Sequence, residues 1–234
     1  MAQLVKKNSI KKYIINQYII NKQRLKKALR RLDTFSPWPI SCSFVMSNDE
    51  KVRFDLEIKH SKHYLEFGMG GSTLRAIRKS KAKIYTVESS PEWIADMREY
   101  RVVTCFENKR LFINSVDIGQ TRLWGYPESK HSRNLYPSYS SDVFNVIDPS
   151  QIDLALVDGR FRVACTLKII LECHQNSNLR IFIHDFWNRQ EYHIVLKYLD
   201  TLEAIDTLGI FSIKTDLDLK LVRADYESYQ FNPD

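Results

Sequence analysis

One stretch limits most strongly which fold this chain can adopt. It is a short apolar run that is followed by a glycine cluster and then by a helical pattern. The apolar stretch is Tyr64–Phe67, the glycines are Gly68, Gly70 and Gly71, and the helical pattern covers residues 72–79. Glycine permits a positive φ angle and lets a ligand approach the backbone closely. A strand, a glycine loop and a helix in this order predict a loop that binds a nucleotide-like ligand.

Strand and helix patterns continue to alternate along the rest of the chain. Strands are predicted at residues 64–67, 83–87, 110–115, 152–157 and 180–183, and helices at 72–79, 91–100, 162–173 and 190–199. Strands separated by helices pair in parallel through right-handed crossovers, so we expect an α/β fold with a doubly wound, mostly parallel, Rossmann-like sheet. Residues 202–214 predict a β pair or one bent strand around Gly209, and residues 218–229 predict a closing helix.

The N-terminal part differs from the rest in charge. Residues 1–33 carry ten Lys or Arg residues and one acid, whereas the whole chain has a net charge of +7, so the remainder is close to neutral. Helical spacing of apolar residues predicts a basic amphipathic arm over residues 1–39, which ends in a proline-rich linker. Such an arm can bind an anionic membrane surface or a protein complex, or it can pack as a solvated helix on its own domain.

The second domain is predicted over residues 40–234. We expect no nucleic-acid partner, because the excess positive charge lies in the arm. No apolar run approaches the roughly 20 residues that span a bilayer, and no signal peptide is visible. The cysteines lack metal-site or disulfide spacing and predict reduced thiols. We therefore expect a cytoplasmic protein, which is peripheral at the inner face of the membrane if the arm binds lipid.

Residues 117–150 do not fit the alternation of strands and helices. The segment is rich in aromatic and basic residues and contains three prolines. Long loops in compact domains are often functional, and this one lies where it can cover the carboxyl edge of the sheet. It predicts either a substrate lid or a structural insertion.

The glycine loop is flanked by an acid, Glu66, and continues into Ser72 and Thr73. A dinucleotide-binding fingerprint needs a third glycine where Thr73 stands, which argues against a nicotinamide-dependent oxidoreductase. The pattern E-x-G-x-G-G-S-T resembles motif I of class I S-adenosylmethionine-dependent methyltransferases. The resemblance implies that residues 66–73 hold S-adenosylmethionine, with glycines under its methionine part and Glu66 at its ammonium group or an ordered water.

Glu88 ends the second predicted strand, 20 residues after Gly68. A carboxylate at this place can accept hydrogen bonds from both ribose hydroxyls, although a surface glutamate before a helix is the alternative. Asp117 follows the third strand. The methyltransferase resemblance implies that this acid lies near the adenine amine of the donor.

Polar side chains also end the fourth and fifth predicted strands. They are Asp158, His184 and Asp185. Adjacent ends of parallel strands lie close together, so we expect these three catalytic candidates to meet. Asp158 and Asp185 could hold Mg²⁺ or another divalent cation that activates a hydroxyl. Alternatively, Asp158 or His184 acts as a general base without metal, or the acids have only structural roles such as helix capping.

Residues 60–200 resemble the metal-dependent O-methyltransferases of the catechol and macrolide-sugar types, but His184-Asp185 stands where those families have an acidic pair. The stretches VDGRFRVAC and HDFWNRQEYH are similar to uncharacterised bacterial methyltransferase-like proteins that are associated with surface polysaccharide synthesis. The resemblance implies an O-methyltransferase acting on a hydroxyl of a glycan, a sugar-linked acceptor or another small molecule. The alternative is an inactive methyltransferase-like module that docks a polysaccharide-assembly complex or the membrane surface.

Basic residues gather around the same predicted strand ends. They are Arg160, Arg162, Arg189 and His193. As a cluster they predict the binding of an acidic acceptor, such as a uronate or a phosphate. Individually, each can instead pair with an acid of its own domain, and His193 can be a structural histidine.

Overall fold

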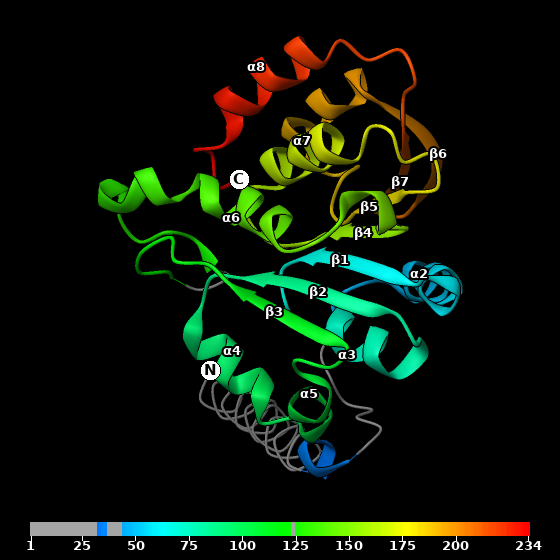
Figure 1. Cartoon of the computed structure of the whole chain (residues 1–234), viewed down its shortest axis with the longest axis vertical. Coiled ribbons are helices and arrows are strands. Elements are labelled where there is room, and N and C mark those ends of the chain that lie inside the picture. The colour runs from blue at the N-terminus through cyan, green and yellow to red at the C-terminus, as the bar shows by residue number, and fades with distance from the viewer. Residues whose placement is uncertain (1–31, 37–43, 123–124) are drawn as a thin grey trace, which may run out of the picture.

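The computed structural model of the protein describes residues 32–36, 44–122 and 125–234. These residues form a seven-stranded sheet with the strand order β3-β2-β1-β4-β5-β7-β6 (Figure 1). The strands β1 to β5 are parallel, whereas β7 runs antiparallel to both β5 and β6. Their bounds are β1 His63–Phe67, β2 Lys83–Glu88, β3 Leu111–Ser115, β4 Leu154–Val157, β5 Arg180–Ile183, β6 Leu199–Ile205 and β7 Leu208–Ile213. The predicted doubly wound, mostly parallel sheet is confirmed.

Helices cover both faces of the sheet because the strands are apolar on both faces. Along β1, Leu65 joins the core cluster on one face and Tyr64 joins the cluster on the other, and both are fully buried. In Figure 1, α7 and α8 lie above the sheet, and α3, α4 and α5 lie below it. The helix bounds are α2 Asn48–His60, α3 Gly71–Lys79, α4 Pro91–Arg98, α5 Arg101–Phe106, α7 Arg162–Cys173 and α8 Leu219–Tyr229.

Several elements differ from the sequence-based expectation. The helix α2 was not predicted, although Ser47 and Glu50 form a capping box at its start. The predicted helix 91–100 ends at Arg98, and α5 follows it. The predicted helix 190–199 is a 3₁₀ segment, η5 (Gln190–Lys197), and β6 begins one residue further on, at Leu199.

The antiparallel pair turns at Asp206, not at Gly209. Asp206 has a φ of 48°, and Gly209 lies inside β7. A Cβ atom at residue 209 would lie 2.4 Å from the Phe211 ring. The glycine is therefore needed for packing of that ring and not for the turn.

The segment 117–150 contains short helical turns. They are η2 (Lys130–Leu135), α6 (Pro137–Ser141) and η3 (Asp142–Asn145), and η4 (Pro149–Gln151) follows. Tyr139, Val143 and Ile147 are buried in the core that also contains α7. The second half of the segment is therefore a packed insertion. A role as a substrate lid stays a prediction for residues 117–135.

The predicted arm over residues 1–39 lies outside the described residues, except for residues 32–36. Residues 32–35 are helical. Where the chain is described, no helix combines the length and the apolar character that crossing a bilayer requires.

Candidate functional site

The glycine loop lies against the turn that follows β4. Gly68 has a φ of 102°, and its N–H donates to the carbonyl of Val87 at 2.9 Å. A Cβ atom at residue 68 would lie 2.9 Å from both the Cα and the N of Gly159. Only glycine fits there, because both the φ angle and the contact exclude a side chain. The space at Gly70 is different, because a Cβ atom there would meet no atom within 4 Å.

Glu66 lies beneath the loop and is fully buried. Its Oε2 accepts hydrogen bonds from Tyr64 (2.9 Å) and Ser72 (2.8 Å), and its Oε1 accepts one from Thr73. The hydroxyl of Thr73 in turn accepts the N–H of Gly70 at 2.9 Å. In the structure the side chains of Glu66, Ser72 and Thr73 bind one another, and their contact with a donor stays a prediction. Together they hold the loop in shape from below.

We expect the protein to lose stability as the pH rises from about 5 to 8. Burial raises the pKa of Glu66 from 4.5 to about 7, although the hydrogen bonds from Thr73, Ser72 and Tyr64 oppose this. Between these values the folded chain binds a proton that the unfolded chain releases, so stability falls with rising pH, by up to about 3 kcal/mol. The raised pKa values of Glu88 and His184 act in the same direction.

Thermal unfolding of the wild type and Glu66→Gln at pH 5.5, 6.5 and 7.5 measures this dependence. The variant should show a shallower fall of the melting temperature, because the glutamine does not titrate. Equal slopes in the two proteins would contradict the role given to Glu66.

Glu88 lies at the carboxyl end of β2, beside the glycine loop, and is 8% exposed. Its Oε1 accepts the N–H groups of Ser89 (2.7 Å) and Ser90 (3.0 Å). Burial raises the pKa of Glu88, and the backbone N–H groups of Ser90, Ser89 and Met69 act against that rise. The indole of Trp93 donates to the carbonyl of Met69 at 2.6 Å, so α4 is tied to the loop.

Asp117 is exposed after β3, and its Oδ1 accepts the N–H of Gly119 at 2.8 Å. It thus lies at the same edge of the sheet as Glu88, because β2 and β3 are parallel neighbours. Contact of this side chain with an adenine stays a prediction.

Asp158, His184 and Asp185 lie together at the ends of β4 and β5. The Nδ1 of His184 is 2.9 Å from Oδ1 of Asp158 and 3.9 Å from Oδ1 of Asp185. The expected meeting of these three residues is present in the structure. Asp185 adopts a φ of 57°, an uncommon left-handed conformation for a non-glycine residue.

Arg162, at the start of α7, occupies the space between the two carboxylates. Its Nη2 lies 3.2 Å from Oδ1 of Asp158, and its Nη1 lies 3.4 Å from Oδ2 of Asp185. Nη1 also donates to the carbonyl of His184, and Nε donates to that of Gly159 at 3.1 Å. The Arg162 side chain is 4% exposed.

This arrangement does not fit the predicted metal ligands Asp158 and Asp185. The guanidinium of Arg162 neutralises both carboxylates from the position that a cation would need. Within residues 32–36, 44–122 and 125–234, no group of three or more His, Cys, Asp or Glu side chains is placed to hold a metal ion. The described residues at this site therefore do not support a catalytic divalent cation.

Glu50, on α2, is a site residue that the sequence did not indicate. Its Oε2 lies 3.6 Å from Nε2 of His184, and its Oε1 accepts two hydrogen bonds from Thr207. His184 is therefore placed between Glu50 and Asp158. Burial lowers the pKa of His184, but the hydrogen bond and charge of Asp158 outweigh it, and the pKa is raised. Both ring nitrogens of His184 face carboxylates, and its role in catalysis stays a prediction.

The other predicted basic residues, Arg189, His193 and Arg160, differ in whether they have partners within the protein. Arg189 lies 3.4 Å from Asp185 and 3.3 Å from the hydroxyl of Tyr192, and Nε2 of His193 lies 3.1 Å from the carbonyl of Phe186. These residues contact groups of their own domain. Arg160 differs from them, because its Nε and Nη1 are buried and receive no hydrogen-bond partner from the described chain.

The turn that carries Arg160 is fixed by the C-terminal segment. Phe161 follows Arg160 with a φ of 54° and is fully buried. Its N–H donates to the carbonyl of Pro233 at 3.2 Å, and its ring packs 5.2 Å from that of Tyr136. The insertion and the C-terminal segment thus meet at this turn.

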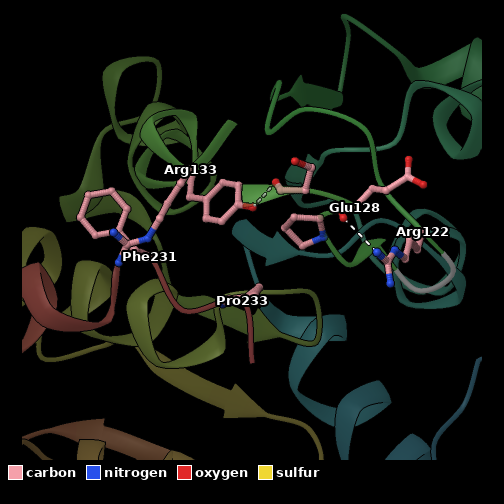
Figure 2. A pocket seen from close by; sticks show the side chains of 8 residues that line it. Arg122, Glu128, Arg133, Phe231 and Pro233 are labelled. Carbon is pink, nitrogen blue, oxygen red and sulfur yellow. Dashed lines mark hydrogen bonds between the residues drawn. The ribbon is translucent and has the colours of Figure 1, made fainter. Parts of the chain in front are cut away.

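A pocket of about 250 Å³ lies where the insertion faces the C-terminal segment (Figure 2). Arg133 stacks on the ring of Phe231 at 4.5 Å, and Arg122 donates to the carbonyl of Glu128 at 2.9 Å. Arg122 and Arg133, two arginines of the insertion, both line this pocket. Its lining residues are Arg122, Pro127, Glu128, Ser129, Arg133, Tyr136, Phe231 and Pro233.

Comparison with known proteins gave structural relatives only. No family model and no curated protein sequence matches the chain. A methyltransferase-like protein from Silicibacter pomeroyi is 25% identical, with a TM-score of 0.69 over 82% of this chain and 98% of that protein.

Other solved structures are less similar, with TM-scores below 0.5. A candidate caffeoyl-CoA O-methyltransferase from Staphylococcus aureus is 15% identical over 86% of this chain and 99% of its own, with a TM-score of 0.48. Fibrillarin from Aeropyrum pernix with bound S-adenosyl-L-methionine is 12% identical over 69% of this chain and 74% of its own, with a TM-score of 0.41. The strand order and the similarity to the Silicibacter protein both indicate the same fold. The chain has the Rossmann-like fold of methyltransferases.

Proposed function

We propose that this protein is an S-adenosylmethionine-dependent O-methyltransferase that acts on a hydroxyl of a glycan or sugar-linked acceptor. The observation that supports the donor best is the loop at the end of β1. It leaves open space at Gly70 and lies beside the buried carboxylate of Glu88. The glycan acceptor is suggested by the sequence resemblance alone.

The donor would be held by the backbone of residues 68–71, by Glu88 and by Asp117. When bound, it supplies an electrophilic methyl group. Glu88 is suited to hydrogen bonding with ribose hydroxyls, because a buried carboxylate accepts two hydrogen bonds strongly. Glu66, Ser72 and Thr73 act indirectly by fixing the loop, which lowers the conformational cost of binding.

Acceptor activation is assigned to Asp158. His184 and Arg162 both donate to its Oδ1, whereas no described residue donates a hydrogen bond to its Oδ2. The side chain is 25% exposed, so Oδ2 can reach an acceptor hydroxyl. In the proposed reaction Oδ2 would take the proton of the acceptor hydroxyl as the hydroxyl oxygen bonds to the methyl carbon of the donor, and the bond from that carbon to the donor sulfur would break with its electron pair left on the sulfur. Asp185 helps to hold Arg162 and His184 in place.

Calorimetric titration with S-adenosylmethionine tests the proposal. We expect binding to the wild type and a loss of affinity of about tenfold or more in Glu88→Ala, because charged hydrogen bonds contribute about 1.5–3 kcal/mol each. Glu99→Gln, an exposed acid at the end of α4, is the control and should bind normally. The proposal fails if the wild type does not bind the donor, or if Glu88→Ala binds it equally well.

A further inference from the structure

Arg160 carries a buried positive charge that the described protein leaves without a counter-ion. The residue is 8% exposed, and its Nε and Nη1 have no hydrogen-bond partner. Buried N–H groups of a guanidinium without hydrogen-bond partners are unfavourable, and native proteins rarely keep them without a reason. Arg162, which is also buried and lies two residues later, makes hydrogen bonds to two carboxylates and to backbone carbonyls. The difference indicates that the partner of Arg160 is a ligand.

The surroundings of Arg160 place it at the candidate site. Its guanidinium carbon lies 4.1 Å from the centre of the Tyr126 ring. A Cβ atom at Gly125 would lie 3.6 Å from Cγ of Arg160 and 3.8 Å from the hydroxyl of Ser89, the residue after Glu88. The side chain therefore runs between the insertion and the end of β2, whereas its backbone belongs to the turn after β4.

Tyr126 also connects this group with the Asp158 side of the site. Burial lowers the pKa of Arg189, but Tyr192, Asp185 and Tyr126 outweigh it, and the pKa is raised. Tyr126 thus lies near both arginines, although only Arg160 is left without a carboxylate. The guanidinium of Arg160 lies over the Tyr126 ring in a cation–π contact, and its Nε and Nη1 are left to donate to an anion.

We propose that Arg160 binds an anionic group, a carboxylate or a phosphate, of a ligand of the candidate site, with Tyr126 as the stacking platform. The inference rests on the proposed function for the nature of that ligand. The anion is either the α-carboxylate of the methyl donor or an acidic group on the acceptor. In both cases a buried, low-dielectric position strengthens the ion pair, and the fork of nitrogens suits two oxygens.

The test uses Arg160→Met, which keeps the length of the side chain and removes its charge. The first titration uses S-adenosylmethionine and its decarboxylated analogue with the wild type and the variant. If the donor supplies the anion, the variant binds S-adenosylmethionine at least about tenfold more weakly than the wild type does. The wild type in turn binds the decarboxylated analogue more weakly than S-adenosylmethionine, by a similar factor. The variant then binds both compounds equally.

The second titration uses inorganic phosphate as the probe, added to protein saturated with donor. If the acceptor supplies the anion, Arg160→Met keeps its donor affinity, and phosphate binds it about tenfold or more weakly than the wild type. Arg98→Met, an exposed residue paired with Glu107, controls for the change in net charge and should change neither affinity. Unchanged affinities for both probes in Arg160→Met overturn the inference.

Unfolding of the ligand-free proteins gives a readout that does not depend on ligand identity. Removal of an unpaired buried charge should raise the melting temperature of Arg160→Met by about 2–4 °C. A fall of several degrees would indicate that Arg160 already has a structural partner and would overturn the inference. A wild type that binds phosphate through Arg160 but binds no donor would refute the methyltransferase proposal and leave the inference on Arg160 in place.

Discussion

Gly68→Ala is expected to destabilise the protein by about 2–6 kcal/mol and to abolish donor binding. Alanine at a φ of 102° is strained, which costs about 1–3 kcal/mol. The added Cβ atom would also lie 2.9 Å from two backbone atoms of Gly159, and overpacking of this kind costs about 1–3 kcal/mol more. The turns after β1 and β4 would have to move apart. Thermal unfolding should show a melting temperature lower by roughly 10 °C.

Gly70→Ala is the matched control two residues later. Its φ of 179° is extended backbone, and its Cβ atom would meet nothing within 4 Å. Stability should change by less than about 0.5 kcal/mol. Donor affinity should nevertheless fall in this variant, because the new methyl group would enter the space assigned to the ligand. Equal stability of the two variants would contradict the packing argument, and normal donor binding by Gly70→Ala would contradict the place assigned to the donor.

Arg162→Met is expected to cost about 3–5 kcal/mol of stability. The variant leaves Asp158 and Asp185 without the cation between them, and removal of one partner from a buried ion pair has this magnitude. Arg98→Met removes an ion pair whose arginine is 48% exposed and should cost less than about 1 kcal/mol. Chemical denaturation of the three proteins measures both values.

A second measurement on Arg162→Met separates charge from packing. If Arg162 occupies the position that a cation would need, Mg²⁺ or Ca²⁺ at millimolar concentration should raise the melting temperature of the variant more than that of the wild type. A loss of stability without any such difference would indicate that packing of the arginine stem accounts for the effect. A loss as small as that of Arg98→Met would contradict the central role given to Arg162.

The sheet could be predicted because its strands are short apolar runs separated by clear turn and helix signals. The strand β5 and the helix α7 were predicted with their observed bounds, and β1 to within one residue. The helix α2 was missed because its apolar residues Phe54 and Ile58 are spread among charged residues. That miss also hid Glu50, whose contact with His184 spans 134 positions of sequence and leaves no local signal.

The candidate site was predicted in part for a similar reason. Strand ends indicate which residues meet, so Asp158, His184 and Asp185 could be grouped. The sequence does not tell which side chain neutralises which charge. Arg160 and Arg162 are two positions apart and look equivalent, yet one is paired and the other is not. The side-chain partners of Glu66 were also hidden, because a motif gives spacing and not the direction of a carboxylate.

The hydrogen bond from Phe161 to Pro233 has a consequence for how the protein is made. Residue 161 leaves the ribosome about 70 residues before its partner, at a time when β1 to β4 are already synthesised. Nascent chains can therefore build most of the sheet, but the turn that carries Arg160 obtains its last contact only when residue 233 emerges. We therefore expect a ligand that needs Arg160 to bind with full affinity only after residue 233 has joined this turn.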